Sequence, residues 1–119
     1  MSIRSERVAS VIKQELGSII SRDLNGSSEY GFATVTEARM TPDLRLARVF
    51  VSILGTDEKK EKTLRYIEHQ KGHYRSLIGS ALHLRFTPVL EFHHDISLDN
   101  AMHIEELIRQ IHKDDKKVE

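Results

Sequence analysis

The sequence predicts an α+β domain in which a small sheet is covered by helices on one face. Residues 4–24 repeat apolar side chains at helical spacing, residues 44–54 alternate as a strand does, and residues 64–84 return to helical spacing. With 119 residues the chain is long enough to bury a core of its own. We therefore expect a single domain over residues 1–113, followed by a charged, flexible tail over residues 114–119.

The first third of the chain predicts a helix and then a strand. The helix spans residues 4–24, and Asn25-Gly26 is typical of a helix end. The strand covers about Phe32–Met40, and its alternation slips between Val35 and Ala38, so we expect a bulge there. The apolar stripe of the helix consists of Val8, Val11, Ile12, Leu16, Ile19, Ile20 and Leu24.

Two further strands are predicted. After the turn signal Thr41-Pro42-Asp43, the strand of about Leu44–Leu54 has the clearest alternation in the chain. A third strand covers about Pro88–His94, with Leu90 and Phe92 on one face. On the second strand one face is predicted to carry Ala47, Val49, Val51 and Ile53, and the other to carry Leu46, Arg48, Phe50 and Ser52.

The stretch Leu64–Leu84 is predicted to be an amphipathic helix that contains a glycine. The helical element begins near Glu58 and ends before Pro88, because proline disfavours helix at the residue before it. A glycine in a helix interior costs about 1 kcal/mol relative to alanine, so Gly72 indicates a kink or a close approach by another molecule. The predicted apolar positions are Leu64, Ile67, Tyr74, Leu77, Ile78, Ala81 and Leu82.

A second glycine, Gly79, falls on the same helical stripe as Gly72. The side chains beside this stripe are Arg65, Arg75, Ser76 and His83. Two interpretations remain open at this point. Either the glycines are tolerated in a surface helix, or their bare backbone, bordered by cations, admits a ligand.

A last helix is predicted near the C-terminus. Ser97 is a candidate N-cap, and Asp99 is favourably placed in the first turn. Its apolar positions are Ile104, Leu107, Ile108 and Ile111.

The charge is unevenly distributed although the formal net charge is zero. Residues 58–88 carry seven basic and three acidic groups, whereas residues 89–119 carry four and eight. Binding depends on the local field rather than on the total charge, so the basic helical element is a candidate for phosphate contact. A solvated helix surface is the alternative interpretation.

No pattern in the sequence indicates catalysis, a metal or a cofactor. The chain has no Cys, which removes disulfides and thiolate ligands, and His93-His94-Asp95 lies on a strand, where neighbouring side chains point to opposite faces. Glu105 and Glu106 are adjacent on a helix, and no Walker, dinucleotide or nucleophile-elbow motif is present. We therefore expect a protein that is not an enzyme and has no cofactor and no metal site.

No membrane segment is predicted, because no apolar run approaches the roughly 20 residues that span a bilayer. The N-terminal residues lack the apolar centre of a signal peptide. We expect a cytoplasmic protein.

One long segment resembles a known family. Arg75–Phe92, with Asp95-Ile96-Ser97-Leu98, is similar to the signature of bacterial ribosome-binding factor A. The resemblance covers about residues 4–112. It extends to Arg7-Val8, Ile12 and Glu15-Leu16 in the first helix and to Met40–Leu44 and Ala47–Val51 in the hairpin.

The resemblance implies a type II KH-like fold and an assembly factor that binds 16S rRNA late in maturation of the small (30S) ribosomal subunit. Such factors are not enzymes and matter most for growth in the cold. The implied partners are the 30S subunit, its 16S rRNA and other assembly factors, including GTPases, and the implied state is a monomer. The family carries an Ala-x-Gly helix–kink–helix where this chain has Gln70-Lys71-Gly72.

Basic side chains near this kink are the candidates for phosphate contact, since the phosphate backbone dominates affinity for RNA. The candidate RNA-binding residues are Arg45, Arg48, Arg65, Gln70, Lys71, Gly72, Arg75 and Ser76. A secondary basic patch comprises Arg4, Arg7 and Lys13. Two alternatives remain: a KH-like module for another RNA, and a protein-interaction domain that uses the C-terminal helix and tail.

Overall fold

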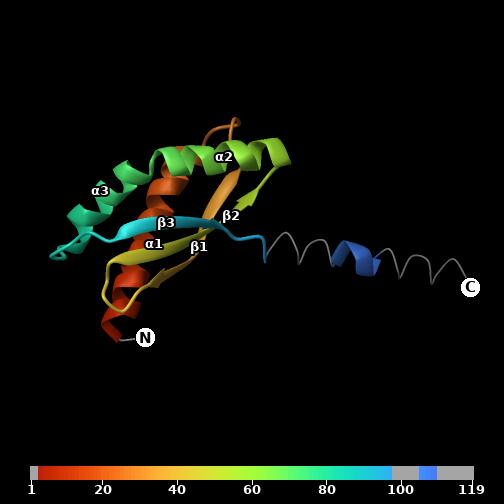
Figure 1. Ribbon diagram of the computed structural model, residues 1–119. Coiled ribbons are helices and arrows are strands. Elements are labelled where there is room, and N and C mark those ends of the chain that lie inside the picture. Colours follow the sequence, from red (N-terminus) through yellow and green to blue (C-terminus); the bar gives the residue numbers. More distant parts are fainter. Residues whose placement is uncertain (1–2, 98–104, 110–119) are drawn as a thin grey trace, which may run out of the picture.

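The computed structural model describes residues 3–97 and 105–109 (Figure 1). The elements in chain order are α1 (Ile3–Leu24), β1 (Phe32–Met40), β2 (Leu46–Leu54), α2 (Asp57–His69), α3 (Lys71–Leu82) and β3 (Val89–His94). Residues 105–109 are helical, in agreement with the predicted last helix. Asp99, Ile104, Ile111 and the predicted tail over residues 114–119 lie outside the described residues.

The three strands form one sheet in the order β1-β2-β3. β1 and β2 are an antiparallel hairpin, whereas β2 and β3 are parallel. A parallel pair needs a long crossover connection, which α2 and α3 provide. The predicted bulge is confirmed, because the register shifts between Val35 and Glu37. β2 begins at Leu46 rather than at Leu44, since the turn continues through Leu44, which has a left-handed φ of 60°.

The core lies between one face of the sheet and the helices. The residues predicted to share one face of the second strand, Ala47, Val49, Val51 and Ile53, are all fully buried, as are Ile12, Leu16, Ile20 and Leu24 of α1. Val11 was predicted in the α1 stripe but is 40% exposed. At 100° per residue it lies beyond the edge of the stripe that faces the sheet.

The helical element breaks at Gln70, not at Gly72. Gln70 has φ −88° and ψ 3°, so it caps both helices, and Gly72 lies within the first turn of α3. Figure 1 shows α2 and α3 joined end to end with a bend between them. The predicted helix–kink–helix at Gln70-Lys71-Gly72 is therefore confirmed, with the break at its first residue, two positions before the glycine.

The end of α3 also differs from the prediction. The helix stops at Leu82 because His83 adopts the left-handed conformation, with φ 51°, well before Pro88. Leu77 is 38% exposed and Ala81 is exposed, although both were predicted on the apolar face. The narrow buried stripe of α3 consists of Tyr74 and Ile78.

A buried tyrosine attaches α3 to the rest of the fold. The Tyr74 hydroxyl donates a 3.0 Å hydrogen bond to Asp23 of α1, and its ring packs edge-on against Phe92 of β3. Burial raises the pKa of Tyr74 above its usual range, and the hydrogen bond to Asp23 raises it further. This contact fixes the position of α3 against both α1 and the sheet.

The other face of the sheet is not covered by the described helices. Phe32 and Leu54 are 54% and 41% exposed at one end of it. The charged side chains on this face are paired, Arg39 with Glu37 at 2.8 Å and Arg48 with Glu91 at 3.4 Å.

Candidate nucleic-acid interface

Three adjoining pockets meet at the exposed ring of Phe86. The first, of about 340 Å³, is lined by Gly72, Arg75, Ser76, Arg85, Phe86 and Thr87. The second, of about 210 Å³, is lined by Arg45, Arg75, Phe86, Thr87 and Val89. The third, of about 160 Å³, is lined by Arg4, Asp43, Leu44, Arg45, Leu84, Arg85 and Phe86. We call these lining residues the Phe86 surface.

Four arginines from different elements line the Phe86 surface. Arg4 comes from the first turn of α1, Arg45 from the turn before β2, Arg75 from α3, and Arg85 from the segment between α3 and β3. The turn before β2 lies beside the segment that carries Arg85 and Phe86, because the backbone N–H of Val89 donates a hydrogen bond of 2.8 Å to Arg45 O. The fold thus gathers cations that the sequence separates by up to 81 residues.

Arg75 holds the segment that carries Phe86. Its Nε donates to Pro88 O at 3.2 Å, and its Nη2 donates to Thr87 O at 2.9 Å. These two bonds tie the segment after α3 back along the helix. Arg75 was predicted as a phosphate contact, and in the structure its guanidinium holds the segment after α3 in position.

Arg85 and Phe86 were not among the predicted site residues. Phe86 is 62% exposed, and the Arg85 guanidinium lies 5.4 Å from its ring centroid. This is cation–π geometry. The available signal was a basic residue followed by an aromatic one in a non-helical segment, a combination typical of single-strand binding surfaces.

Asp43 is the one acidic residue that lines these three pockets in the described part of the chain. Its carboxylate accepts hydrogen bonds from Thr41 Oγ1 at 2.7 Å and from the backbone N–H of Arg45 at 3.2 Å. These bonds hold the pKa of Asp43 below its usual value. The carboxylate therefore stabilises the turn that presents Arg45. Four arginines and this one carboxylate line the surface, so its net charge is positive.

The two glycines of α3 differ in their surroundings. A Cβ added to Gly72 would meet no atom within 4 Å, so the backbone there borders open space. A Cβ added to Gly79 would lie 2.6 Å from Thr87 Oγ1. Gly79 is thus required by the packing of the segment after α3, and the interpretation of both glycines as one bare stripe for a ligand was wrong.

Several predicted site residues lie away from the Phe86 surface. Arg48 points to the open face of the sheet and pairs there with Glu91. Lys71 makes an ion pair of 3.6 Å with Glu68, and Gln70 is partly buried at the helix break. Arg65 is exposed on α2 and lines none of the three pockets.

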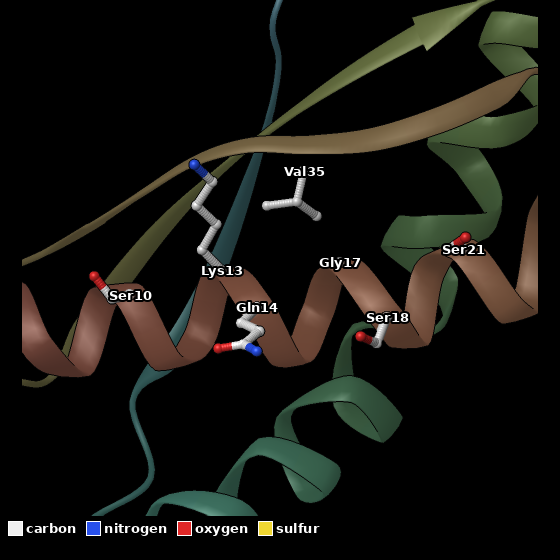
Figure 2. Close-up of a pocket in the computed structure, with 7 residues that line it drawn as sticks. All are labelled: Ser10, Lys13, Gln14, Gly17, Ser18, Ser21 and Val35. Carbon is white, nitrogen blue, oxygen red and sulfur yellow. The ribbon is translucent and has the colours of Figure 1, made fainter.

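The predicted secondary patch divides into separate parts. Arg4 joins the Phe86 surface, and Arg7 is exposed further along α1. Lys13 lines a separate groove of about 460 Å³, where Figure 2 shows its side chain extending from α1 toward β1. The small residues that line this groove include Ser10, Gly17, Ser18 and Ser21.

The described residues contain no group of three or more His, Asp or Glu side chains placed to hold a metal ion. Within residues 3–97 and 105–109, no helix combines the length and the apolar character that crossing a bilayer requires.

Comparison with known proteins identifies the family. A model of the family described as ribosome-binding factor A matches residues 4–108. The chain belongs to the ribosome-binding factor A family. This match confirms the resemblance found in the sequence. The Phe86 surface is therefore a surface of a ribosome-binding factor A protein.

Solved structures confirm the fold expected for ribosome-binding factor A. The crystal structure of ribosome-binding factor A from Thermus thermophilus has a TM-score of 0.63 and 19% identity, covering 76% of this chain and 94% of that one. The solution structure of a Thermotoga maritima protein has a TM-score of 0.53 and 23% identity, covering 76% and 82%.

A third match is a homology model of the Thermus thermophilus factor, fitted into an electron-microscopy map of its complex with the 30S subunit. It has a TM-score of 0.56 and 17% identity, covering 72% of this chain and 93% of that one. The α+β architecture with a three-stranded sheet and packed helices is thus shared with this family, as a KH-like fold requires.

Proposed function

We propose that this protein is an assembly factor of the small ribosomal subunit that binds 16S rRNA late in 30S maturation, through the Phe86 surface. Family membership supports ribosome binding, and the 30S complex of the Thermus relative supports the small subunit as partner. The proposal includes action as a monomer in the cytoplasm, alongside other assembly factors such as GTPases, with the greatest requirement during growth in the cold.

The observation that carries the proposal is the gathering of Arg4, Arg45, Arg75 and Arg85 around one exposed aromatic ring. Guanidinium groups bind phosphate oxygens strongly because their N–H donors match the phosphate geometry. Gly72 leaves open backbone at the same surface, where a phosphate can approach closely. Ser76 lines the pocket beside Gly72 and adds a hydroxyl donor to the proposed contact.

Removing two of these charges tests the proposal. The double variant Arg45→Gln/Arg85→Gln leaves Arg75, and with it the segment after α3, in place. We expect its affinity for immature small subunits to fall about tenfold. The slope of log affinity against log salt should fall by between about 1 and 2, since two phosphate contacts are lost. The measurement is a binding titration with purified immature subunits at several salt concentrations.

The matched control is Arg39→Gln/Lys62→Gln, which removes the same charge from the ion pairs with Glu37 and Glu29, outside the Phe86 surface. The control should bind as the wild type does. Equal losses in both double variants, or no loss in the first, would contradict the proposal.

A protein-interaction role remains a second candidate because the open face of the sheet carries an apolar pocket. This pocket, of about 490 Å³, is lined by Phe32, Thr34, Thr36, Ser52, Leu54, Asp95 and Ser97. Binding to subunits that is insensitive to salt and lost on Phe32→Ser would favour this role over RNA binding.

A further inference from the structure

We propose that Phe86 is a stacking site for one unpaired nucleobase, so that the Phe86 surface takes single-stranded RNA rather than an uninterrupted duplex. This inference rests on the proposed RNA binding and specifies the class of RNA that the surface accepts.

The exposure of Phe86 requires an explanation. A phenylalanine side chain that is 62% exposed leaves apolar area in water, where covering it would be favourable. Phe86 lines all three pockets of the surface, so space opens around its ring on several sides. The ring is therefore placed where a ligand can cover it.

The pockets are large enough for a planar ring. A cavity of about 150 Å³ is known to admit benzene. The pocket between Arg45, Arg75 and Phe86 measures about 210 Å³, and that beside Gly72 measures about 340 Å³. Both have room for a base lying on the phenylalanine ring.

The segment that presents Phe86 is fixed before any ligand binds. Arg75 donates to the carbonyl oxygens of Thr87 and Pro88, the residues that follow Phe86. Thr87 packs directly onto Gly79 of α3. A platform held in this way loses little conformational entropy on binding, which raises affinity.

The charges around the ring fit the chemistry of a nucleotide. Base–aromatic stacking together with arginine contacts to the flanking phosphates is the general mode of single-strand binding. Arg45 and Arg85 line the pockets beside Phe86 together with its ring. Bases inside a duplex are already stacked and paired, so they cannot stack on Phe86 without being flipped out.

The test uses two RNA probes, a single-stranded uridine 10-mer, whose bases stack only weakly on one another, and a blunt RNA duplex of ten base pairs. We expect Phe86→Ala to weaken binding of the 10-mer about tenfold without changing its salt dependence, because no phosphate contact is lost. Phe86→Trp should restore binding to within about twofold of the wild type. Binding of the duplex should be the same for all three proteins.

A second readout reports stacking directly. With 2-aminopurine in the middle of the 10-mer, we expect fluorescence quenching on binding to the wild type and to Phe86→Trp, but little quenching with Phe86→Ala. Because Phe86 is exposed, both variants should keep the wild-type circular dichroism spectrum and melting temperature.

The outcomes separate this inference from the proposed function. The stacking site is overturned if Phe86→Ala binds the 10-mer as tightly as the wild type does, or if it weakens binding of the duplex as much as binding of the 10-mer. It is also overturned if the wild type binds no 10-mer in 50 mM salt. The proposed function fails on a different result, namely unchanged binding of Arg45→Gln/Arg85→Gln to immature subunits.

Discussion

At the scale of single residues, the side chains that line the Phe86 surface differ in what holds them, and one of them also holds the surface together. Arg75 uses two of its donors on main-chain oxygens of Thr87 and Pro88, so its loss would move the surface as well as remove a charge. Arg45 and Arg85 also line the pockets, whereas Arg48 is paired on another face. Residue type alone does not distinguish these roles.

The two glycines of α3 give a residue-scale prediction. Gly72→Ala should stabilise the protein by about 0.5 to 1 kcal/mol, because the added methyl group meets no atom and alanine favours helix. The same substitution should weaken binding to immature subunits several-fold, since the methyl group fills space that a phosphate would occupy. Urea unfolding and a binding titration measure the two effects.

Gly79→Ala serves as the comparison. It should destabilise the protein by about 1 to 3 kcal/mol, because the new Cβ lies 2.6 Å from Thr87 Oγ1. Adding Thr87→Ala should recover most of that loss by removing the clash. If Gly72→Ala left subunit binding unchanged, close approach of RNA to the α3 backbone would be wrong.

At the scale of elements, the bulge in β1 connects the hairpin to the chain that follows β3. The bulged residue Thr36 donates a 2.6 Å hydrogen bond to Asp95, just after β3. Asp95 also donates its backbone N–H to Val51 O of the central strand at 2.7 Å. The hydrogen bonds from Thr36 and from Ser97 hold the pKa of Asp95 below its usual value.

This contact predicts a pH dependence. A carboxyl group whose pKa is lowered by folding contributes stability above its unfolded pKa of about 3.9, and that stability is lost as the pH falls through the folded value. Thr36→Val should therefore reduce the free energy of unfolding by about 1 kcal/mol at pH 7, with a smaller difference from the wild type at pH 2.5. Urea unfolding at both pH values is the measurement.

Thr34→Val is the matched control, since Thr34 lies in the same strand and is exposed. It should change stability little at either pH. A loss in Thr36→Val that is the same at pH 7 and pH 2.5 would show that the charge on Asp95 plays no part.

The sequence was sufficient to predict the strands and helices that bury one face, because their apolar residues recur with a regular period. The alternation of Ala47 to Ile53 follows from one face of β2 lying in the core, and the slip after Val35 marks the bulge in β1. The site was less predictable, because it depends on a non-periodic segment. Nothing in the spacing of Gly79 shows that Thr87 returns to pack on it, and so Arg85 and Phe86 were not recognised as part of the surface.

At the scale of the whole molecule, the helices and the charges are both distributed asymmetrically. Helices cover one face of the sheet, and the other face carries paired charges and exposed Phe32 and Leu54. The Phe86 surface combines the start of α1, the turn before β2, and α3 with the segment after it. A protein of zero formal net charge thereby presents one surface rich in arginine, which is what binding to a polyanion requires.

Binding of the Phe86 surface to rRNA on immature small subunits is tested most directly by ultraviolet crosslinking. The protein is crosslinked to these subunits, and the crosslinked peptides are identified by mass spectrometry. We expect nucleotides of 16S rRNA to be attached to peptides containing Phe86 and to those containing Arg45 or Gly72. Crosslinks confined to Phe32, Leu54 and the open face of the sheet, or attachment to ribosomal proteins alone, would contradict this binding mode.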